Sequence, residues 1–412
     1  MLPKGPIAQA TLRTSSVLGL RVFAQAGTLL LLAHLLGPAD YGTFAGLASL
    51  AVVLGTLATF GTHLVVLAET SRHPETAHRV LSYALPTTLI GAATLLSAYM
   101  VVCWLAYGHA RAPLAFVFMI GATELLLQPL LGLVAMGEMA RGRTALSQVI
   151  FTVPLMLRMM AATVLMLLRP EAVLLWFGVA YFAVGALSLL VCLASTSTRW
   201  PSVREWKLPS RSDLRHSAGY AATSFTAMGP GEVDKTLSTF LLPSVANGVY
   251  AAATRIVGAT TLPVTAMTLS ALPKLLRENA KQPTHPSKLT IWVFGSAFVY
   301  GMVLAIMLWT VAPAISLLFS GQYQGIVDVI RLLSFAAPGM TLRIAAGSTL
   351  LAMDRPWMRV GFETAGLCLL AVASVVLTSG SGPKGMPLAL IASEWTMALV
   401  GTICVFRANR PH

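Results

Sequence analysis

Ionisable side chains inside long apolar segments are the residues of this sequence that could do chemistry. Of its 412 residues, 56% are hydrophobic and only 10% are charged. Burying a charge in such a segment is costly, so each one invites a functional hypothesis. Three basic residues lie among small and polar neighbours, namely Arg21, Lys235 and Arg255. Fixed cations can replace water around a phosphate group, and Arg can do so with two parallel hydrogen bonds.

Arg21 and Arg255 are candidate contacts for an anionic substrate. Arg21 shares a helix face with Gln25 and Thr28, which follow it by four and seven residues. We predict that Arg21 and Gln25 bind a phosphate or a sugar. An ion pair within a helical bundle and snorkelling of Arg21 to the membrane interface remain alternatives. Arg255, next to Thr254, is predicted as a further contact nearer the outer face.

Lys235 lies in the most unusual local sequence, GPGEVDK at positions 229–235. A Gly-Pro-Gly triplet in mid-span frees backbone hydrogen bonds and predicts a kink or a break in the helix. Interrupted helices of this kind often mark the binding site of a transporter. Lys235 is therefore predicted to contact the substrate. Asp234 is interpreted as structural, paired with a neighbouring helix, in preference to a proton carrier.

Two pairs of opposite charges at mid-span are predicted as structural ion pairs, Glu124 with Arg158 and Arg343 with Glu363. Glu394 has no evident partner in the sequence and could be protonated at rest. Coupling of transport to an ion gradient is the alternative role for these buried acids. The candidates for that role are Glu124, Asp234, Glu363 and Glu394.

No metal site or cofactor is predicted. The four cysteines are scattered singly through apolar segments, and the eight histidines form no HExxH motif. No GxxxxGK[ST] phosphate-binding loop is present in the sequence either, so ATP-driven transport would need another subunit.

Membrane-spanning helices must position these side chains. The chain carries 28 Lys and Arg against 15 Asp and Glu, a net charge of +13. A soluble domain would be about a quarter charged, so the composition excludes a soluble enzyme, a disordered chain and a soluble nucleic-acid binder. Apolar runs of about 20 residues, enough to cross a bilayer, recur from end to end. The predicted spans are 14–36, 43–68, 79–107, 113–137, 144–168, 172–196, 213–242, 246–273, 289–319, 325–353, 357–378 and 386–406.

The basic residues also predict the orientation of these twelve helices. Nineteen of the 28 Lys and Arg fall in connections on one predicted side and three on the other. The positive-inside rule then places both termini in the cytoplasm. Most connections are only a few residues long, and none could fold into a soluble catalytic domain, which argues against a membrane enzyme.

An internal repeat divides the chain into two halves. The segment 36–45 resembles 242–251, with Gly42 matching Gly248 and Phe44 matching Tyr250, at an offset of half the chain length. Two six-helix lobes are predicted, 1–196 and 213–412, joined by a basic cytoplasmic linker at 197–212. Because each lobe has an even number of helices, a pseudo-two-fold axis along the membrane normal should relate them.

These motifs resemble those of the Wzx-type polysaccharide transporter family of the multidrug/oligosaccharidyl-lipid/polysaccharide (MOP) superfamily. The resemblance rests on LLGPADYG at 35–42, on Asp234-Lys235 followed by NGVYAAATR at 247–255, and on FSGQY at 319–323. It implies an all-α polytopic membrane protein with the multidrug-exporter-like fold, in which the first two helices of each lobe line a central cavity. It also implies a flippase that moves undecaprenyl-pyrophosphate-linked oligosaccharides to the periplasmic leaflet by alternating access.

The leading hypothesis is therefore a non-enzymatic flippase of the bacterial inner membrane that serves O-antigen, capsule or exopolysaccharide biosynthesis. Its expected partners are the polyprenyl pyrophosphate sugar, membrane lipids, and a polysaccharide polymerase with glycosyltransferases, but no nucleic acid. The resemblance suggests that a monomer is sufficient. The alternatives are an ion-coupled multidrug exporter of the same superfamily and a non-transporting scaffold of a polysaccharide assembly complex.

Overall fold

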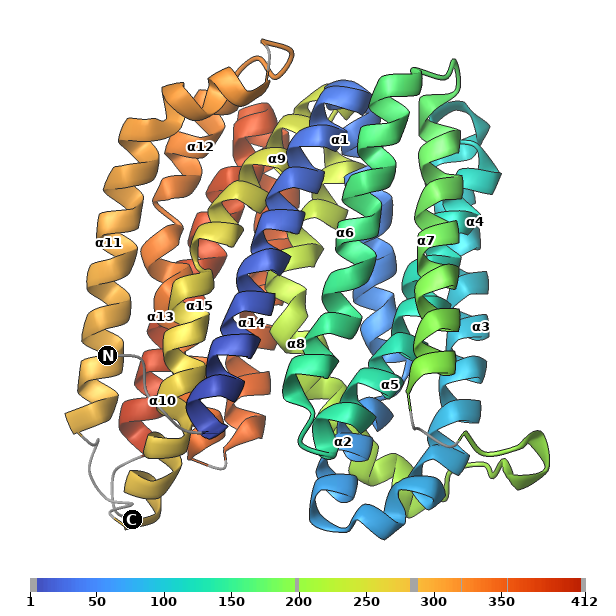
Figure 1. Ribbon diagram of the computed structural model, residues 1–412. Helices are drawn as coiled ribbons and strands as arrows, with labels where there is room; N and C mark the ends of the chain where they lie inside the picture. The colour runs from blue at the N-terminus through green and yellow to red at the C-terminus, as the bar shows by residue number, and fades with distance from the viewer. Residues whose placement is uncertain (1–5, 197–199, 282–287, 320, 354, 409–412) are drawn as a thin grey trace. The chain divides into compact units, whose positions relative to one another are not determined.

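The computed structural model describes residues 6–196, 200–281, 288–319, 321–353 and 355–408, and no β-strand occurs in these ranges. The chain forms two compact units (Figure 1). Unit 1 comprises Met1–Leu36 and Leu47–Phe225, and unit 2 comprises Gly37–Gly46 and Thr226–His412. Both chain termini, for which a cytoplasmic location is predicted, lie outside the described residues.

Unit 1 contains most of the first eight helices. They are α1 (Pro6–Ala58), α2 (Thr62–Arg72), α3 (Ala77–Arg111), α4 (Leu114–Ala122), α5 (Gln128–Ala140), α6 (Thr144–Leu168), α7 (Val173–Ser195) and the first half of α8 (Arg211–Leu241). Three short elements connect them, namely η1 (Pro74–Thr76), the π-helical η2 (Thr123–Leu127) between α4 and α5, and η3 (Val203–Glu205).

Unit 2 contains the second half of α8 and the remaining helices. They are α9 (Ser244–Thr260), α10 (Leu262–Lys281), α11 (Lys288–Ser316), α12 (Ile326–Ser334), α13 (Ala337–Ala352), α14 (Pro356–Ser381) and α15 (Gly385–Ala408). The 3-10 turns η4 (Leu317–Phe319) and η5 (Gly382–Lys384) lie at the ends of α11 and α14.

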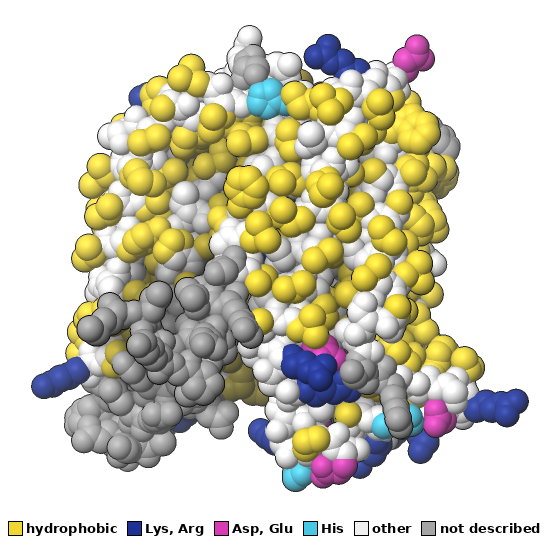
Figure 2. Space-filling view, in the orientation of Figure 1, with side chains coloured by type: hydrophobic (Ala, Val, Ile, Leu, Met, Phe, Trp, Pro, Cys, Tyr) yellow, Lys and Arg dark blue, Asp and Glu magenta, His cyan; other side chains and the backbone are white. Residues whose placement is uncertain are grey.

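Joined across their short breaks, these helices follow the order of the twelve predicted spans. By length and hydropathy, seven helical stretches of the described residues could cross a membrane, and the pair α12–α13, bent by 47°, would make an eighth. The helices α8, α9 and α10 are not among them, because α8 and α10 are too polar and α9, of 17 residues, is too short on its own. Figure 2 shows hydrophobic side chains along the sides of the helices and charged ones gathered toward their ends.

Two glycines determine where the chain bends in and between the first two predicted spans. The spans 14–36 and 43–68 run together as α1, which kinks at Gly37 with φ 67° and ψ 174°. Gly37 precedes Pro38, and the ring of a proline disfavours the helical conformation in the residue before it. The second span is interrupted at Phe60 and Gly61, which have φ angles of 48° and 75°. Glycine adopts positive φ without steric cost.

The two copies of the sequence repeat contact each other inside unit 2. A Cβ added to Gly42 would lie 2.6 Å from the backbone nitrogen of Gly248, and one added to Gly248 would lie 1.8 Å from the carbonyl oxygen of Pro38. The amide of Asn247 donates a hydrogen bond of 2.8 Å to the carbonyl of Gly42. The repeated glycines are therefore required by a backbone-to-backbone approach.

The third motif packs against the first. The Tyr323 ring lies 6.4 Å from the ring of Tyr41 and 4.9 Å from that of Phe319. All three side chains are buried. The FSGQY motif, whose Ser320 lies outside the described residues, thus supplies aromatic packing for the turn that carries LLGPADYG.

The Gly-Pro-Gly triplet does not break its helix. α8 is continuous from Arg211 to Leu241 with Pro230 inside it, so of the predicted kink or break, the break is wrong. Proline removes one backbone donor but leaves the ladder on either side intact. The boundary between the two units falls a few residues earlier, at Phe225 and Thr226. The contact-based units also differ from the predicted lobes by placing Gly37–Gly46 in unit 2.

We expect Gly248→Ala to destabilise the protein, because its new methyl group would overlap the Pro38 carbonyl. Overpacking of this kind costs roughly 1–3 kcal/mol or more. Gly258→Ala, on the same helix with open space around its Cβ, is the matched control and should be neutral or stabilising by about 1 kcal/mol. Thermal melting of the purified protein in detergent measures both. Equal melting temperatures for the two variants would contradict the close approach.

Candidate functional site

Arg21 lies in unit 1 without an acidic partner there among the described residues. Its guanidinium is 5.9 Å from the centre of the Phe151 ring on α6, and the residue is half-buried. The Gln25 side chain is exposed, and the hydroxyl of Thr28 on the same face is buried with no hydrogen-bond partner in the described residues. This face of α1 therefore presents a cation and unsatisfied polar groups.

Lys235 of α8 is buried, with 5% of its surface exposed. Its ammonium lies 3.4 Å from the carboxylate of Glu232 and 3.6 Å from that of Asp234, and it donates to the carbonyl of Gly231. Two acids thus surround one base on consecutive turns of one helix. A phosphate that reached Lys235 would have to compete with both carboxylates.

Asp234 connects this cluster to the next helix. The hydroxyl of Tyr250 on α9 donates a hydrogen bond of 3.1 Å to its second carboxylate oxygen. Both residues are buried. This contact fits the structural role predicted for Asp234. Arg255, two turns along α9 from Asn247, is half-buried.

A polar network that was not predicted extends the cluster along α8. Ser238 donates a hydrogen bond of 2.6 Å to the amide oxygen of Asn247, whose nitrogen reaches the Thr239 hydroxyl at 3.0 Å. The same nitrogen holds the Gly42 carbonyl. Sequence reasoning missed these residues because Ser and Thr are common in membrane helices. The signal was available in Asn247, an amide within a motif that the repeat already singled out.

In unit 1, Arg158 and Glu124 form the predicted ion pair, with 3.3 Å between Nη2 and Oε1. Tyr181 of α7 completes a buried triad. Its hydroxyl donates to Glu124 at 2.5 Å and accepts from Arg158 at 2.7 Å, while the guanidinium lies 3.7 Å from its ring centre. Glu124 lies on the π-helical turn η2. Turns of this type are often found at functional sites.

In unit 2, Arg343 does not pair as predicted. Its Nε lies 2.7 Å from Glu394 of α15, and Glu363 instead binds Arg359, one turn earlier on α14, at 2.9 Å. The predicted Arg343–Glu363 pair is therefore wrong, as is the expectation that Glu394 has no partner. All four charges still lie close together. Glu363 and Glu394 each retain one buried carboxylate oxygen without a hydrogen-bond donor in the described residues.

Two apolar grooves lie elsewhere on unit 2. One, of about 520 Å³, lies between α11 and α15, and the other, of about 480 Å³, lies beside Trp309 and Phe335. Both are lined almost entirely by aliphatic and aromatic side chains, so they fit hydrocarbon and not a phosphate. No cluster of three or more His, Cys, Asp or Glu in the described ranges could hold a metal ion.

The fold is that of a known class of membrane proteins. The chain is an all-helical, multi-pass membrane protein with the fold of MOP-superfamily transporters, which confirms the predicted fold class. No protein-family model and no curated protein matches the sequence.

The similarity is to solved structures at low sequence identity. An inward-facing multidrug resistance MATE-family transporter of the MOP superfamily is 16% identical, with a TM-score of 0.69 and 93% of each chain covered. The lipid II flippase MurJ, in an inward closed conformation, is 11% identical, with a TM-score of 0.68 over 96% of this chain and 87% of that one. A MOP-superfamily transporter from Pyrococcus furiosus, described as having a binding pocket of reverse polarity, is 13% identical, with a TM-score of 0.63 over 96% and 94%.

We expect Arg343→Met to destabilise the protein by about 3–5 kcal/mol, because it leaves Glu394 buried without its cation. The double variant Arg343→Met/Glu394→Met should recover part of this loss. A double-mutant cycle by thermal melting should give a larger coupling for Arg343 with Glu394 than for Arg343 with Glu363. The reverse order would restore the pairing inferred from the sequence.

Proposed function

We propose that the protein is a flippase for lipid-linked oligosaccharides of the polyprenyl pyrophosphate type. It would act by alternating access in a bacterial inner membrane, with both termini in the cytoplasm, and supply polysaccharide biosynthesis together with a polymerase and glycosyltransferases. The fold is compatible with this role, since one similar structure is described as a lipid II flippase. We also propose Gln25 and Arg255 as substrate contacts, and Lys235 as a contact that forms when its ammonium leaves Glu232 and Asp234.

The observation that carries the proposal is that Arg21 is a half-buried cation beside an aromatic ring and, within the described part of unit 1, not in an ion pair. Unlike Arg158, Arg343 and Lys235, it has no carboxylate within ion-pair distance among the residues of its unit that the structure describes. A cation held half-buried beside an aromatic ring stays available for an incoming anion. A pyrophosphate that crosses about 30 Å of hydrocarbon needs such a group to replace its water.

One observation favours a second candidate, an ion-coupled exporter of organic cations. The α8 cluster holds Glu232 and Asp234 against the single base Lys235, so it carries an excess negative charge. An acidic site of this kind attracts cations. A similar structure is described as a multidrug resistance transporter. The flippase thus rests on a cation of unit 1 that would bind an anionic substrate, and the exporter rests on acids of unit 2 that would bind a cationic one.

Proteoliposomes with a fluorescent polyprenyl-pyrophosphate sugar test the flippase directly. Arg21→Gln should slow flipping about tenfold or more, since a hydrogen bond to a charged group contributes roughly 1.5–3 kcal/mol. Arg21→Lys should retain part of the rate. The control is Arg331→Gln, because Arg331 is another half-buried cation that stacks on an aromatic ring, Trp309, at 5.6 Å.

Unchanged flipping by Arg21→Gln would refute the role of this residue. If the wild-type protein flips no lipid-linked sugar but accumulates an organic cation against a pH gradient, the exporter is correct. Neither activity in folded protein would leave the scaffold as the function.

The buried acids also predict how transport is driven. Among the four candidates, Asp234, Glu363 and Glu394 each have a buried carboxylate oxygen with no hydrogen-bond donor in the described residues, where a proton could bind. The oxygen of Asp234 lies 3.6 Å from the ammonium of Lys235, which makes Asp234 the least suitable of the three. If transport is proton-coupled, Glu363→Gln, which cannot titrate, should abolish the response to a pH gradient and leave downhill flipping intact. Glu138→Gln is the matched control, because Glu138 is equally buried but bound by Arg141 and Arg143. An unaltered pH-gradient response in Glu363→Gln would exclude Glu363 as the proton carrier.

A further inference from the structure

The segment that joins α7 to α8 is an ordered structure and not a loose tether. Trp200 packs into two hydrophobic clusters of unit 1, against residues of α2, α3 and α5 in one and of α5, α6 and α7 in the other. Pro201 is buried beside it. The backbone N–H of Lys207 then donates a hydrogen bond of 3.0 Å to the carbonyl of Ser82 on α3. These contacts fix both sides of the segment 200–207 against one end of unit 1.

Local hydrogen bonds hold the tip of this segment in one shape. Ser202 and Glu205 form a capping box around η3, and the indole N–H of Trp206 donates to the carbonyl of Pro201 at 3.3 Å. The backbone and hydroxyl hydrogen bonds from Ser202 hold the pKa of Glu205 below its ordinary value. Glu205 also lies 3.7 Å from His78 of α3. The Glu205 carboxylate is therefore already engaged by Ser202 and His78.

The outer surface of the segment is apolar and basic. Val203 and Leu208 are 72% and 78% exposed, the highest values among exposed large hydrophobic residues of α7, the linker and α8. Arg204 and Lys207, next to each of them, are also exposed. Single exposed hydrophobic side chains are common on protein surfaces. Two such side chains on one ordered loop, each next to a basic residue, would fit a binding partner that is both apolar and anionic.

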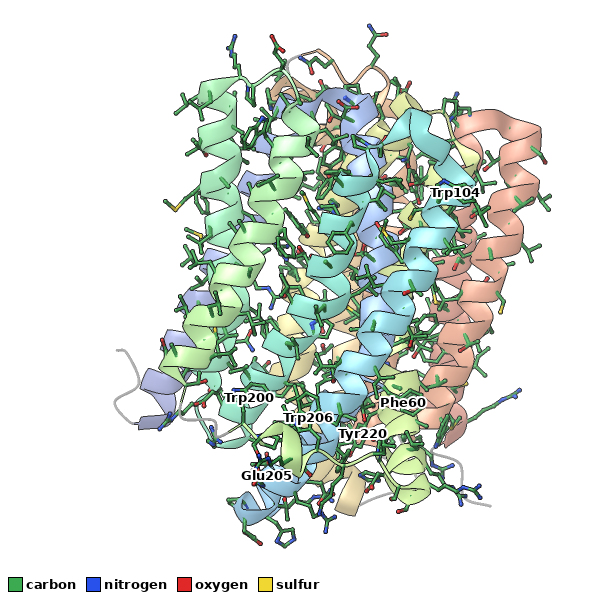
Figure 3. All side chains as sticks on the ribbon, turned by 90° about the vertical axis from the view of Figure 1, so that its right-hand side faces the viewer. Phe60, Trp104, Trp200, Glu205, Trp206 and Tyr220 are labelled. Atoms are coloured by element: carbon green, nitrogen blue, oxygen red, sulfur yellow. The ribbon has the colours of Figure 1, made fainter. Side chains whose placement is uncertain are left out.

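The position of the segment in unit 1 identifies that partner. In Figure 1 it is the green loop that projects sideways beyond the lower end of α3, and in Figure 3 Trp200, Glu205 and Trp206 mark its course when that side faces the viewer. The window of α3 that could cross a membrane is only 22% buried inside the protein. A helix so apolar and so little covered is expected to face lipid, and the loop beside its end is then expected at the level where the hydrocarbon meets the headgroups.

We propose that the segment 200–210 is an interfacial anchor that binds anionic phospholipid. Val203 and Leu208 insert at the boundary of the acyl chains, the half-buried Trp206 lies at headgroup level as interfacial tryptophans do, and Arg204 and Lys207 bind lipid phosphates. Basic residues close to an anionic membrane surface are attracted by its negative potential, which adds to the binding of the apolar side chains. This anchor is independent of the substrate and of the direction of transport.

Site-directed fluorescence tests the depth of the anchor. Val203→Cys and Leu208→Cys, each labelled with an environment-sensitive dye in a variant without the native cysteines, are compared with Glu75→Cys, since Glu75 lies in an exposed turn of the same unit. In nanodiscs, we expect lipids with a shallow quencher to quench the dye at 203 and 208 several-fold more than at 75. Equal quenching at all three positions would overturn the proposal.

The preference for anionic over neutral lipid tests the role of the two basic residues, Arg204 and Lys207. The number of phosphatidylglycerol molecules retained by the protein, relative to phosphatidylcholine, is measured by native mass spectrometry. Arg204→Gln/Lys207→Gln should lower this preference, whereas Lys384→Gln, an exposed basic residue of η5 in unit 2, should not. An unchanged preference in the double variant would refute phospholipid binding by this segment, whatever the outcome for flipping.

Discussion

A charge buried among apolar helices must find an opposite charge or a polar cage, and the internal contacts of this protein depend on that constraint. In unit 1, Arg158 joins α6 to Glu124 on η2 and to Tyr181 on α7. In unit 2, Arg343 joins α13 to Glu394 on α15. Hydrocarbon gives helices little reason to associate through hydrophobicity, so such polar contacts and close packing determine which helices are neighbours. The first cluster joins the fourth, fifth and sixth predicted spans of the first half, and the second joins the fourth and sixth predicted spans of the second half.

The same constraint separates structural charges from charges that remain for a substrate. A cation whose hydrogen bonds are already made to carboxylates binds an anion only by giving them up, at a cost that buried pairs make large. Lys235 is in this position, with Glu232 and Asp234 around it. Arg21 is not, since its neighbour is the weakly attracting ring of Phe151. Both are cations within a predicted span, and only the contacts distinguish them.

The sequence predicted the order of the helices because hydropathy acts over whole spans. It predicted the pair Glu124–Arg158, whose residues lie in adjacent spans. It could not predict the partner of Arg343, because a helix turns by about 100° per residue, and span boundaries uncertain by a few residues leave its facing direction open. Glu363 then pairs locally with Arg359, four residues earlier on the same helix, and this leaves Arg343 to the acid of another helix. The role of Asn247 was likewise missed, because its amide donates a hydrogen bond to the carbonyl of Gly42, which is far away in the sequence.

The two halves of the chain share a close glycine contact at equivalent positions, but their buried ion pairs join different helices. Gly42 and Gly248 occupy equivalent positions and meet backbone to backbone, where no other residue type fits. An ion pair demands only that opposite charges meet, so its members can change places between helices. In the first half the Arg is on the fifth segment and the Glu on the fourth, while in the second half the Arg is on the tenth and its Glu on the twelfth. A repeat in such a protein is therefore best detected through its glycines, and its buried charges are best assigned from contacts.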